Sequence, residues 1–200
     1  MPASGLAPGL APGLAPKPRP SPDDHHGVSR FAATLRITGL CIVGSVAYGV
    51  VHDLFTAHVC LEYFTIGHPR LFASDAPWLH ALAWGVIATW WVGLGLGLGL
   101  SFAALAGRRP PRTAGSLIRP IAALLGGVGA LAAAAGIVAH VAAEAGHLQL
   151  AEFWSEQIEP ARAARFLSVA VVHSTSYVAG VLGMVGLGIW VWRSRRPPGP

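Results

Sequence analysis

Four long apolar stretches alternate with shorter polar segments along the chain. An α-helix needs about 20 residues to cross a hydrocarbon layer of about 30 Å, and each stretch reaches that length. They cover residues 32–55, 77–105, 118–142 and 166–192. The pattern predicts an all-α fold, a polytopic membrane protein built as a four-transmembrane-helix bundle.

Glycines in the second and fourth stretches favour close packing of these helices. The run from Gly93 to Gly99 alternates glycine with leucine, and the fourth stretch carries Gly180, Gly183 and Gly186. Within lipid the backbone can satisfy its hydrogen bonds only by staying helical, so the glycines become flat surfaces for a neighbouring helix. The same Gly-rich faces could bind a second copy of the chain or another membrane subunit.

Composition agrees with the membrane assignment and restricts the partners. Of the 200 residues 53% are hydrophobic and 12% charged, whereas a soluble domain has about a quarter charged. The net charge is +5, but the basic residues gather beside the apolar spans and not on one solvated face. We therefore expect the lipid bilayer as the partner, and no nucleic acid.

The basic residues also predict an orientation. One side of the spans has only Arg70, Arg162 and Arg165. The other side has eleven: Lys17, Arg19, Arg30, Arg36, Arg108, Arg109, Arg112, Arg119, Arg193, Arg195 and Arg196. Because basic residues concentrate on the cytoplasmic side, both termini are expected in the cytoplasm and the two longer connections outside.

The ends of the chain differ from its transmembrane part, expected over 31–193. Residues 1–30 hold three GLAP repeats and are rich in proline and glycine, so they are expected to form a disordered cytoplasmic tail. Residues 194–200 form a second tail. In the second outer connection, apolar residues at helical spacing predict a short amphipathic helix over 147–159, ending before Pro160.

Histidines carry the candidate chemistry. Each predicted span has one near its outer end: His52, His80, His140 and His173. From the helical rise of 1.5 Å per residue, these four lie within roughly 8 Å of one another in height. Imidazoles with carboxylates suit transition metals, and two facing histidines suit haem. The candidate metal ligands are His52, Asp53, His80, His140 and His173, with Glu62, His68 and Glu144 as further ligands or lids.

Two other interpretations are consistent with the same residues. The cluster could be a proton relay or a cavity for a polar substrate, or the histidines could simply pack at the membrane interface. If the protein is an enzyme, metal-assisted or redox chemistry at the outer face is expected. The alternative is a non-catalytic membrane component or transporter-like protein, whose polar cluster only orders the mouth of the bundle.

Two segments carry a resemblance. Tyr48-Gly-Val-Val-His-Asp53 and Glu62-Tyr-Phe-Thr-Ile-Gly-His-Pro69 resemble the VHD and EYFT…GHP segments of a family of small, multi-span bacterial integral membrane proteins of uncharacterised activity. The resemblance covers mainly residues 37–70. It implies a bacterial multi-span membrane protein, which we expect in the inner membrane, and it implies no activity, cofactor or partner.

Overall fold

The computed structural model describes residues 22–195, with side chains from Ser29 onward, so most of the expected N-terminal tail lies outside the described residues. In chain order its elements are α1 (Pro22–Val59), α2 (Glu62–Thr65), α3 (Pro77–Ile87), α4 (Trp90–Leu105), α5 (Ala114–Glu144), α6 (Glu152–Ser155), the 3₁₀ turn η1 (Pro160–Arg162) and α7 (Ala163–Ser194). No strand occurs among them. The all-α prediction is confirmed.

Four helical segments are long and apolar enough to cross a membrane: Ser29–Val59, Pro77–Leu105, Ala114–Glu144 and Pro160–Ser194. They coincide with the four predicted stretches. The second has the predicted bounds, and the other three extend a few residues further because helical hydrogen bonding continues past the last apolar residue. Helix α1 begins at Pro22, about ten residues before the expected start, so part of the predicted tail is helical.

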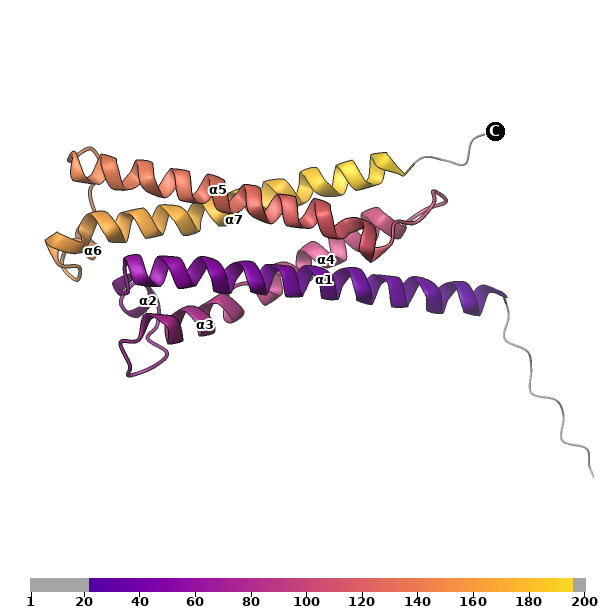
Figure 1. Cartoon of the computed structure of the whole chain (residues 1–200), viewed down its shortest axis with the longest axis horizontal. Coiled ribbons are helices and arrows are strands. Elements are labelled where there is room, and N and C mark those ends of the chain that lie inside the picture. The colour runs from indigo at the N-terminus through magenta and orange to yellow at the C-terminus, as the bar shows by residue number, and fades with distance from the viewer. Residues whose placement is uncertain (1–21, 196–200) are drawn as a thin grey trace, which may run out of the picture.

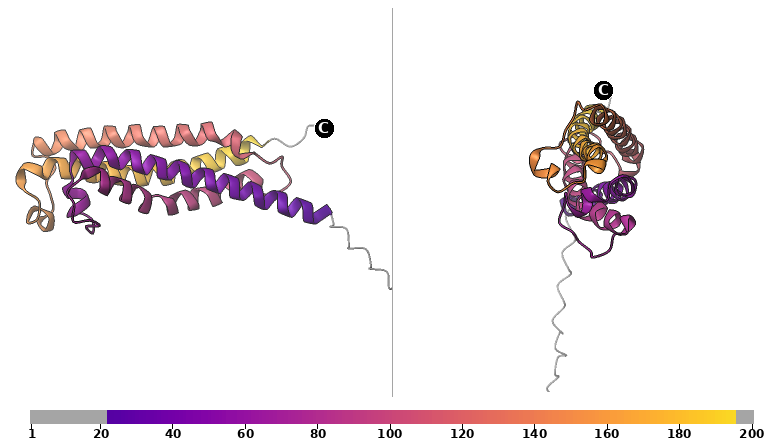
Figure 2. Two further views of the ribbon diagram at one scale, coloured as in Figure 1. Left: turned by 60° about the horizontal axis from the view of Figure 1, so that its bottom comes forward. Right: turned by 90° about the vertical axis from the view of Figure 1, so that its left-hand side faces the viewer.

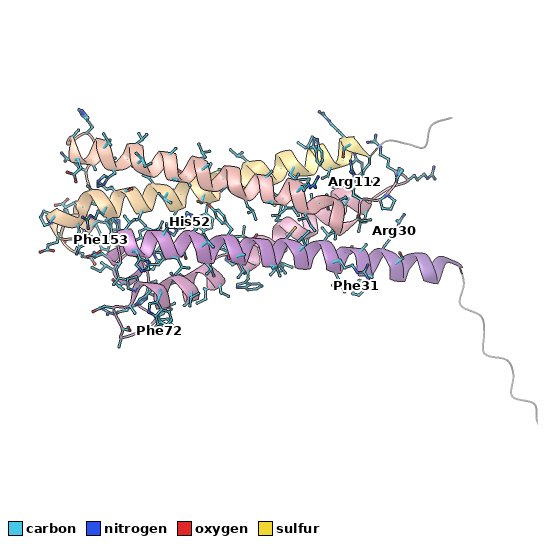
Figure 3. The ribbon with its side chains drawn as sticks, viewed as in Figure 1. Arg30, Phe31, His52, Phe72, Arg112 and Phe153 are labelled. Carbon is cyan, nitrogen blue, oxygen red and sulfur yellow. The ribbon has the colours of Figure 1, made fainter. Side chains whose placement is uncertain are left out.

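The spans form two antiparallel hairpins that pack against each other. Helices α3 and α4 lie along α1, and α5 lies along α7, while contacts between the two hairpins are fewer. Figures 1 and 2 show the elongated bundle, with α2 and α6 at one end and the α4–α5 loop and the end of α7 at the other. Arg30 and Arg112 lie at the loop end, and Phe72 and Phe153 at the α2/α6 end (Figure 3).

Glycines bring α1 and the second span into backbone contact. A Cβ atom on Gly85 would lie 2.6 Å from Val50 Cα, one on Gly93 2.6 Å from Ile42 Cα, and one on Gly97 2.5 Å from Thr38 Cα. Gly95 and Gly99, on the other face of α4, have open space at that position. The predicted packing surface is thus the i, i+4 pair Gly93 and Gly97, extended by Gly85. In α7 only Gly183 contacts another helix, at Leu124.

The second span is not one regular helix. Regular α-helical bonding is interrupted at Ala88–Thr89, where the Thr89 N–H bonds Val86 O, three residues back. The Thr89 hydroxyl also donates to Gly85 O. Side-chain bonding of this kind to the preceding turn bends helices. The break separates α3 from α4 and lies beside the cavity described below.

The second connection contains a shorter helix than the sequence predicts. Helix α5 ends at Glu144 and is followed two residues later by Gly146, whose φ of +78° only glycine adopts readily. Residues 147–151 then cap α5 and lead into α6, which spans Glu152–Ser155. The expected apolar face still packs inward, since Leu150, Trp154 and Ile158 join a cluster with Cys60, Phe166 and Val169.

At the loop end, Arg195 holds the α4–α5 connection in place. This residue is 2% exposed, and its guanidinium donates to the carbonyl oxygens of Ala103, Arg109 and Pro110 at 2.6–2.9 Å. It also stacks on the Trp192 ring. Burial lowers the pKa of Arg195, with smaller contributions from Arg109 and Arg30.

Candidate metal centre

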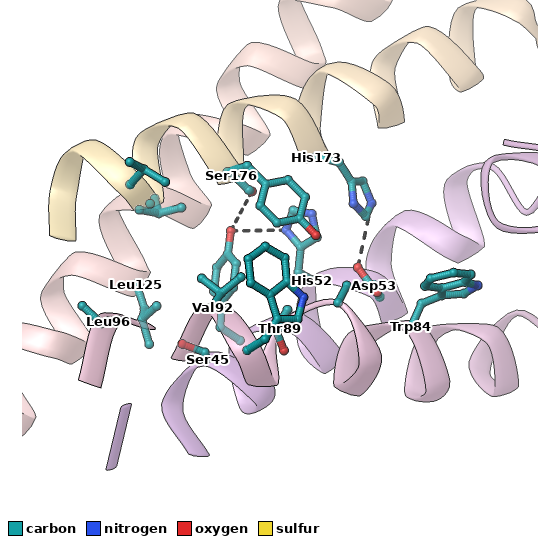
Figure 4. A pocket seen from close by; sticks show the side chains of 18 of the residues that line it. Ser45, His52, Asp53, Trp84, Thr89, Val92, Leu96, Leu125, His173 and Ser176 are labelled. Carbon is teal, nitrogen blue, oxygen red and sulfur yellow. Dashed lines mark hydrogen bonds and ion pairs between the residues drawn. The ribbon is translucent and has the colours of Figure 1, made fainter. Parts of the chain in front are cut away.

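Three of the predicted ligands meet between the hairpins. His52 and Asp53 come from α1 and His173 from α7, and one potential ligand atom of each lies within 4.8 Å of the others. Figure 4 shows the three side chains converging from opposite helices. The structure therefore brings together two imidazoles and one carboxylate from positions 120 residues apart.

The contact between His173 and Asp53 in this cluster is buried. His173 Nε2 lies 3.8 Å from Asp53 Oδ1, and the two side chains are 12% and 7% exposed. Thr56, one turn after His52, places its hydroxyl 3.2 Å from His173 Nε2 while donating to the His52 carbonyl oxygen. A carboxylate in such a position is costly unless a positive or hydrogen-bonding group compensates it.

His52 is oriented by a hydroxyl relay. The Tyr48 hydroxyl lies 3.3 Å from His52 Nδ1 and 2.9 Å from the Ser176 hydroxyl on α7. The second ring nitrogen, Nε2, is buried and has no hydrogen-bond partner among the described residues. The His52 and His173 rings meet edge to face, with centroids 4.7 Å apart. One nitrogen of His52 is thus held by a hydrogen bond, and the other has a position open for a metal ion or a hydrogen-bond partner.

The remaining predicted ligands lie outside this trio. His68 lines the adjoining cavity, but its Nδ1 bonds Tyr63 O at 2.9 Å. His80 is fully buried in the first turn of α3, where Nε2 bonds Ser74 O at 2.8 Å and the ring packs on Phe72. His140 is half-buried on α5, whose packed face carries Gly136 and Ala139 instead.

The two further carboxylates, Glu62 and Glu144, also lie outside the trio. Glu62 accepts a hydrogen bond from Cys60 Sγ and pairs with Arg162 at 3.4 Å, which ties α2 to the start of α7. Glu144 is exposed at the end of α5. Thr56 and Ser176 were not predicted. Their positions, four and three residues after His52 and His173, place them on the same helix faces and are the signal that could have found them.

A cavity of about 290 Å³ adjoins the cluster. Its wall combines polar groups at the α2/α6 end with apolar groups deeper in the bundle, among them Leu96, Leu124, Leu125, Val128 and Met184. Tyr63 and Phe64 of α2 cover its polar end. Burial raises the pKa of Tyr63, with smaller contributions from Tyr177 and Asp53, so this phenol stays protonated at neutral pH.

The geometry is suited to a small cation. Ligands of a tetrahedral ion at about 2.1 Å lie about 3.4 Å apart, so donor atoms up to 4.8 Å apart must close by up to about 1.4 Å. Rotation about χ1 and χ2 achieves shifts of that size.

Comparison of the chain with protein-family models, with curated proteins and with solved structures finds no match.

Proposed function

We propose that this protein is a multi-pass membrane protein that holds one divalent transition-metal ion between its two hairpins, with His52, Asp53 and His173 as ligands. The observation that carries the proposal is the buried, unpartnered Nε2 of His52 beside the Asp53–His173 pair. A buried imidazole nitrogen without a partner costs free energy, and a metal ion bound by His52, Asp53 and His173 would remove that cost.

Metal binding accounts for the cluster better than a proton relay does. A proton shared between Asp53 and His173 would satisfy that pair and leave His52 Nε2 unpaired. The hydroxyl relay from Ser176 through Tyr48 to His52 Nδ1 is the outer-shell support that metal-bound histidines usually have, because it fixes the ring tautomer and orientation.

An ion also fits better than haem. Two axial histidines stand on opposite faces of a porphyrin, whereas the rings of His52 and His173 touch directly, with no space for a macrocycle between them. Two imidazoles and one carboxylate suit iron(II), zinc or manganese and leave coordination positions open. Open positions beside a cavity are typical of a reactive centre and not of a structural one.

We further propose an inner-membrane location with both termini in the cytoplasm. The supporting observation is the charge distribution, because the α2/α6 end has three basic residues and the loop end and its flanking segments have eleven. The metal centre then lies in the outer half of the membrane. The resemblance of the His52 and Glu62 segments to bacterial membrane proteins supports the same location.

The test is the metal content of the purified full-length protein. The chain is purified in detergent without chelators or nickel resin, and metals are measured by mass spectrometry. We expect about one transition-metal ion per chain in the wild type and a loss of at least tenfold in His173→Ala and His52→Ala. His140→Ala is the matched control, since His140 lies outside the trio, and it should keep the wild-type content.

Two results would overturn the proposal. One is a wild type that contains no metal and takes up none when incubated with iron(II), zinc or manganese. The other is equal metal content in His173→Ala and His140→Ala. Either result would leave the non-catalytic interpretation, in which the cluster only orders the end of the bundle.

A further inference from the structure

The cavity beside the metal centre opens sideways between α4 and α7. Trp91 on α4 and Tyr177 and Val181 on α7 line the cavity, and they are 54%, 43% and 53% exposed. Gly95, one turn after Trp91, also lines it and is exposed. These exposed lining residues come from α4 and α7, and a Cβ atom at Gly95 would meet no other atom within 4 Å.

This mouth lies at the depth of the hydrocarbon. Trp91 is 14 residues into the 29-residue span Pro77–Leu105, and Val181 is 21 residues into the 35-residue span Pro160–Ser194. A side opening near the middle of two spans faces lipid tails. At the α2/α6 end, by contrast, Tyr63 and Phe64 cover the cavity, and Phe64 is only 1% exposed. Access is therefore easier from the bilayer than from water.

Whereas Ser45 and Thr89 add single hydroxyl groups deeper in the bundle, the ionisable side chains of the cavity wall gather at one end. Asp53, His52 and His173 are there, as are the hydroxyl-bearing rings of Tyr63 and Tyr177, neither of which forms a hydrogen bond to another described residue. From His173 to Met184 the wall runs eleven residues along α7, about 16 Å, and becomes apolar. A molecule that fits must carry a hydrogen-bonding head and an apolar body.

The size of the cavity and the chemistry of its wall restrict the head group of the molecule that it can bind. A dry cavity of about 150 Å³ binds benzene, so about 290 Å³ accommodates a substituted ring with the start of a chain, but not a phospholipid. The described lining has no lysine or arginine, the usual partners of phosphate and carboxylate heads, and it is rich in aromatic faces such as Trp84 and Trp91. A flat, uncharged ring bearing oxygens fits this wall.

We infer that the cavity binds a lipid-soluble molecule of the quinone and quinol class, which enters from the bilayer between α4 and α7 and places its ring oxygens at the His52–Asp53–His173 end. Hydroxyl and imidazole groups at that end can both donate to quinone oxygens and accept from quinol hydroxyls. The inference rests on the proposed metal centre, because it gives that centre its ligand class.

The test uses the full-length protein in lipid nanodiscs, titrated with a decyl-substituted benzoquinone. Quinones quench tryptophan fluorescence, and Trp84 and Trp91 lie in the cavity wall. We expect saturable quenching in the wild type. Gly95→Leu places a side chain across the mouth and should weaken binding at least tenfold. Gly99→Leu is the matched control, one turn along the same helix face, with open space and no contact with the cavity.

Metal content measured on the same samples separates this inference from the proposed function. Two results would overturn the quinone site while the metal centre stands. One is a metal-loaded wild type in which quenching rises linearly without saturation. The other is equal quinone binding by Gly95→Leu and Gly99→Leu. Saturable binding that Gly95→Leu weakens, in a wild type without metal, supports the cavity ligand and overturns the metal centre.

Discussion

The hydroxyl groups of Tyr48 on α1 and Ser176 on α7 lie 2.9 Å apart and join the two hairpins beside the candidate metal centre. The same Tyr48 oxygen lies 3.3 Å from His52 Nδ1. One phenol therefore serves both the packing of the hairpins and the orientation of a ligand. This double role makes Tyr48 the most informative position outside the ligand trio.

Tyr48→Phe should weaken metal binding without unfolding the bundle. Loss of an outer-shell partner usually lowers metal affinity by about 10- to 100-fold, and the ring of phenylalanine keeps the packing. Titration of the metal-free protein with iron(II) or zinc measures the effect. Ser176→Ala leaves the Tyr48–His52 contact and should change the affinity less; an equal loss in both variants would contradict the assigned role of Tyr48.

Gly85→Ala should destabilise the first hairpin. The added Cβ would lie 2.6 Å from Val50 Cα, which is backbone and cannot move aside, so the helices must separate. Overpacking of this kind costs about 1–3 kcal/mol. Unfolding by sodium dodecyl sulfate, followed by circular dichroism, measures the difference. Gly99→Ala, with open space at the same position, should unfold like the wild type.

The thiol of Cys60 should be unreactive near neutral pH. Burial, followed by its hydrogen bond to Glu62, raises the pKa of Cys60 from 9.0 to about 12. A shift of 12 − 9 = 3 in pKa lowers the thiolate fraction at pH 8 by about 1000-fold, and the fraction recovers only as the pH rises toward 12. The measurement is the rate of maleimide labelling of a Cys41→Ser variant at pH 8.

Two comparisons make that result interpretable. A cysteine at the exposed position Glu156 is the reactive control, and detergent denaturation should make Cys60 react at the control rate. Labelling of native Cys60 as fast as Glu156→Cys would show that the α2 segment does not cover it.

Single cysteines at the two ends should report the orientation. In a Cys41→Ser, Cys60→Ser background, Glu156→Cys is expected to react with a membrane-impermeant maleimide in intact cells. Arg108→Cys, exposed in the α4–α5 loop, should react only after the cells are broken. The reverse pattern would place the metal centre on the cytoplasmic side and contradict the count of basic residues.

The sequence predicts the spans well because their length and apolarity are set by the thickness of the bilayer. It also predicts that His52 and His173 share one level, because the helical rise is constant, and their ring centroids lie 4.7 Å apart. The sequence does not predict how each helix is rotated about its own axis. His140 lies next to Ala139, but Gly136 and Ala139 face α7, so the imidazole turns about 100° away from that face.

Rotation depends on contacts that hydropathy does not encode. Gly136 meets Val172 and accepts a hydrogen bond from Ser168 at its carbonyl oxygen, and these contacts fix how α5 faces α7. His80 is withdrawn by a different local cause, its bond to Ser74 O. The apolar pattern of 77–105 does not predict the break at Thr89 either, because the pattern is continuous across it.

The two hairpins contribute ligands unequally, with His52 and Asp53 from the first and His173 from the second. Each hairpin can enter the membrane as a unit before they associate. A chain with only its first hairpin inserted has two of the three donors, and in a misdocked pair His173 is out of reach of the other two. If the proposed metal is bound, tight binding would be a property of the finished assembly alone, and metal occupancy would distinguish fully assembled protein from every intermediate on the way to it.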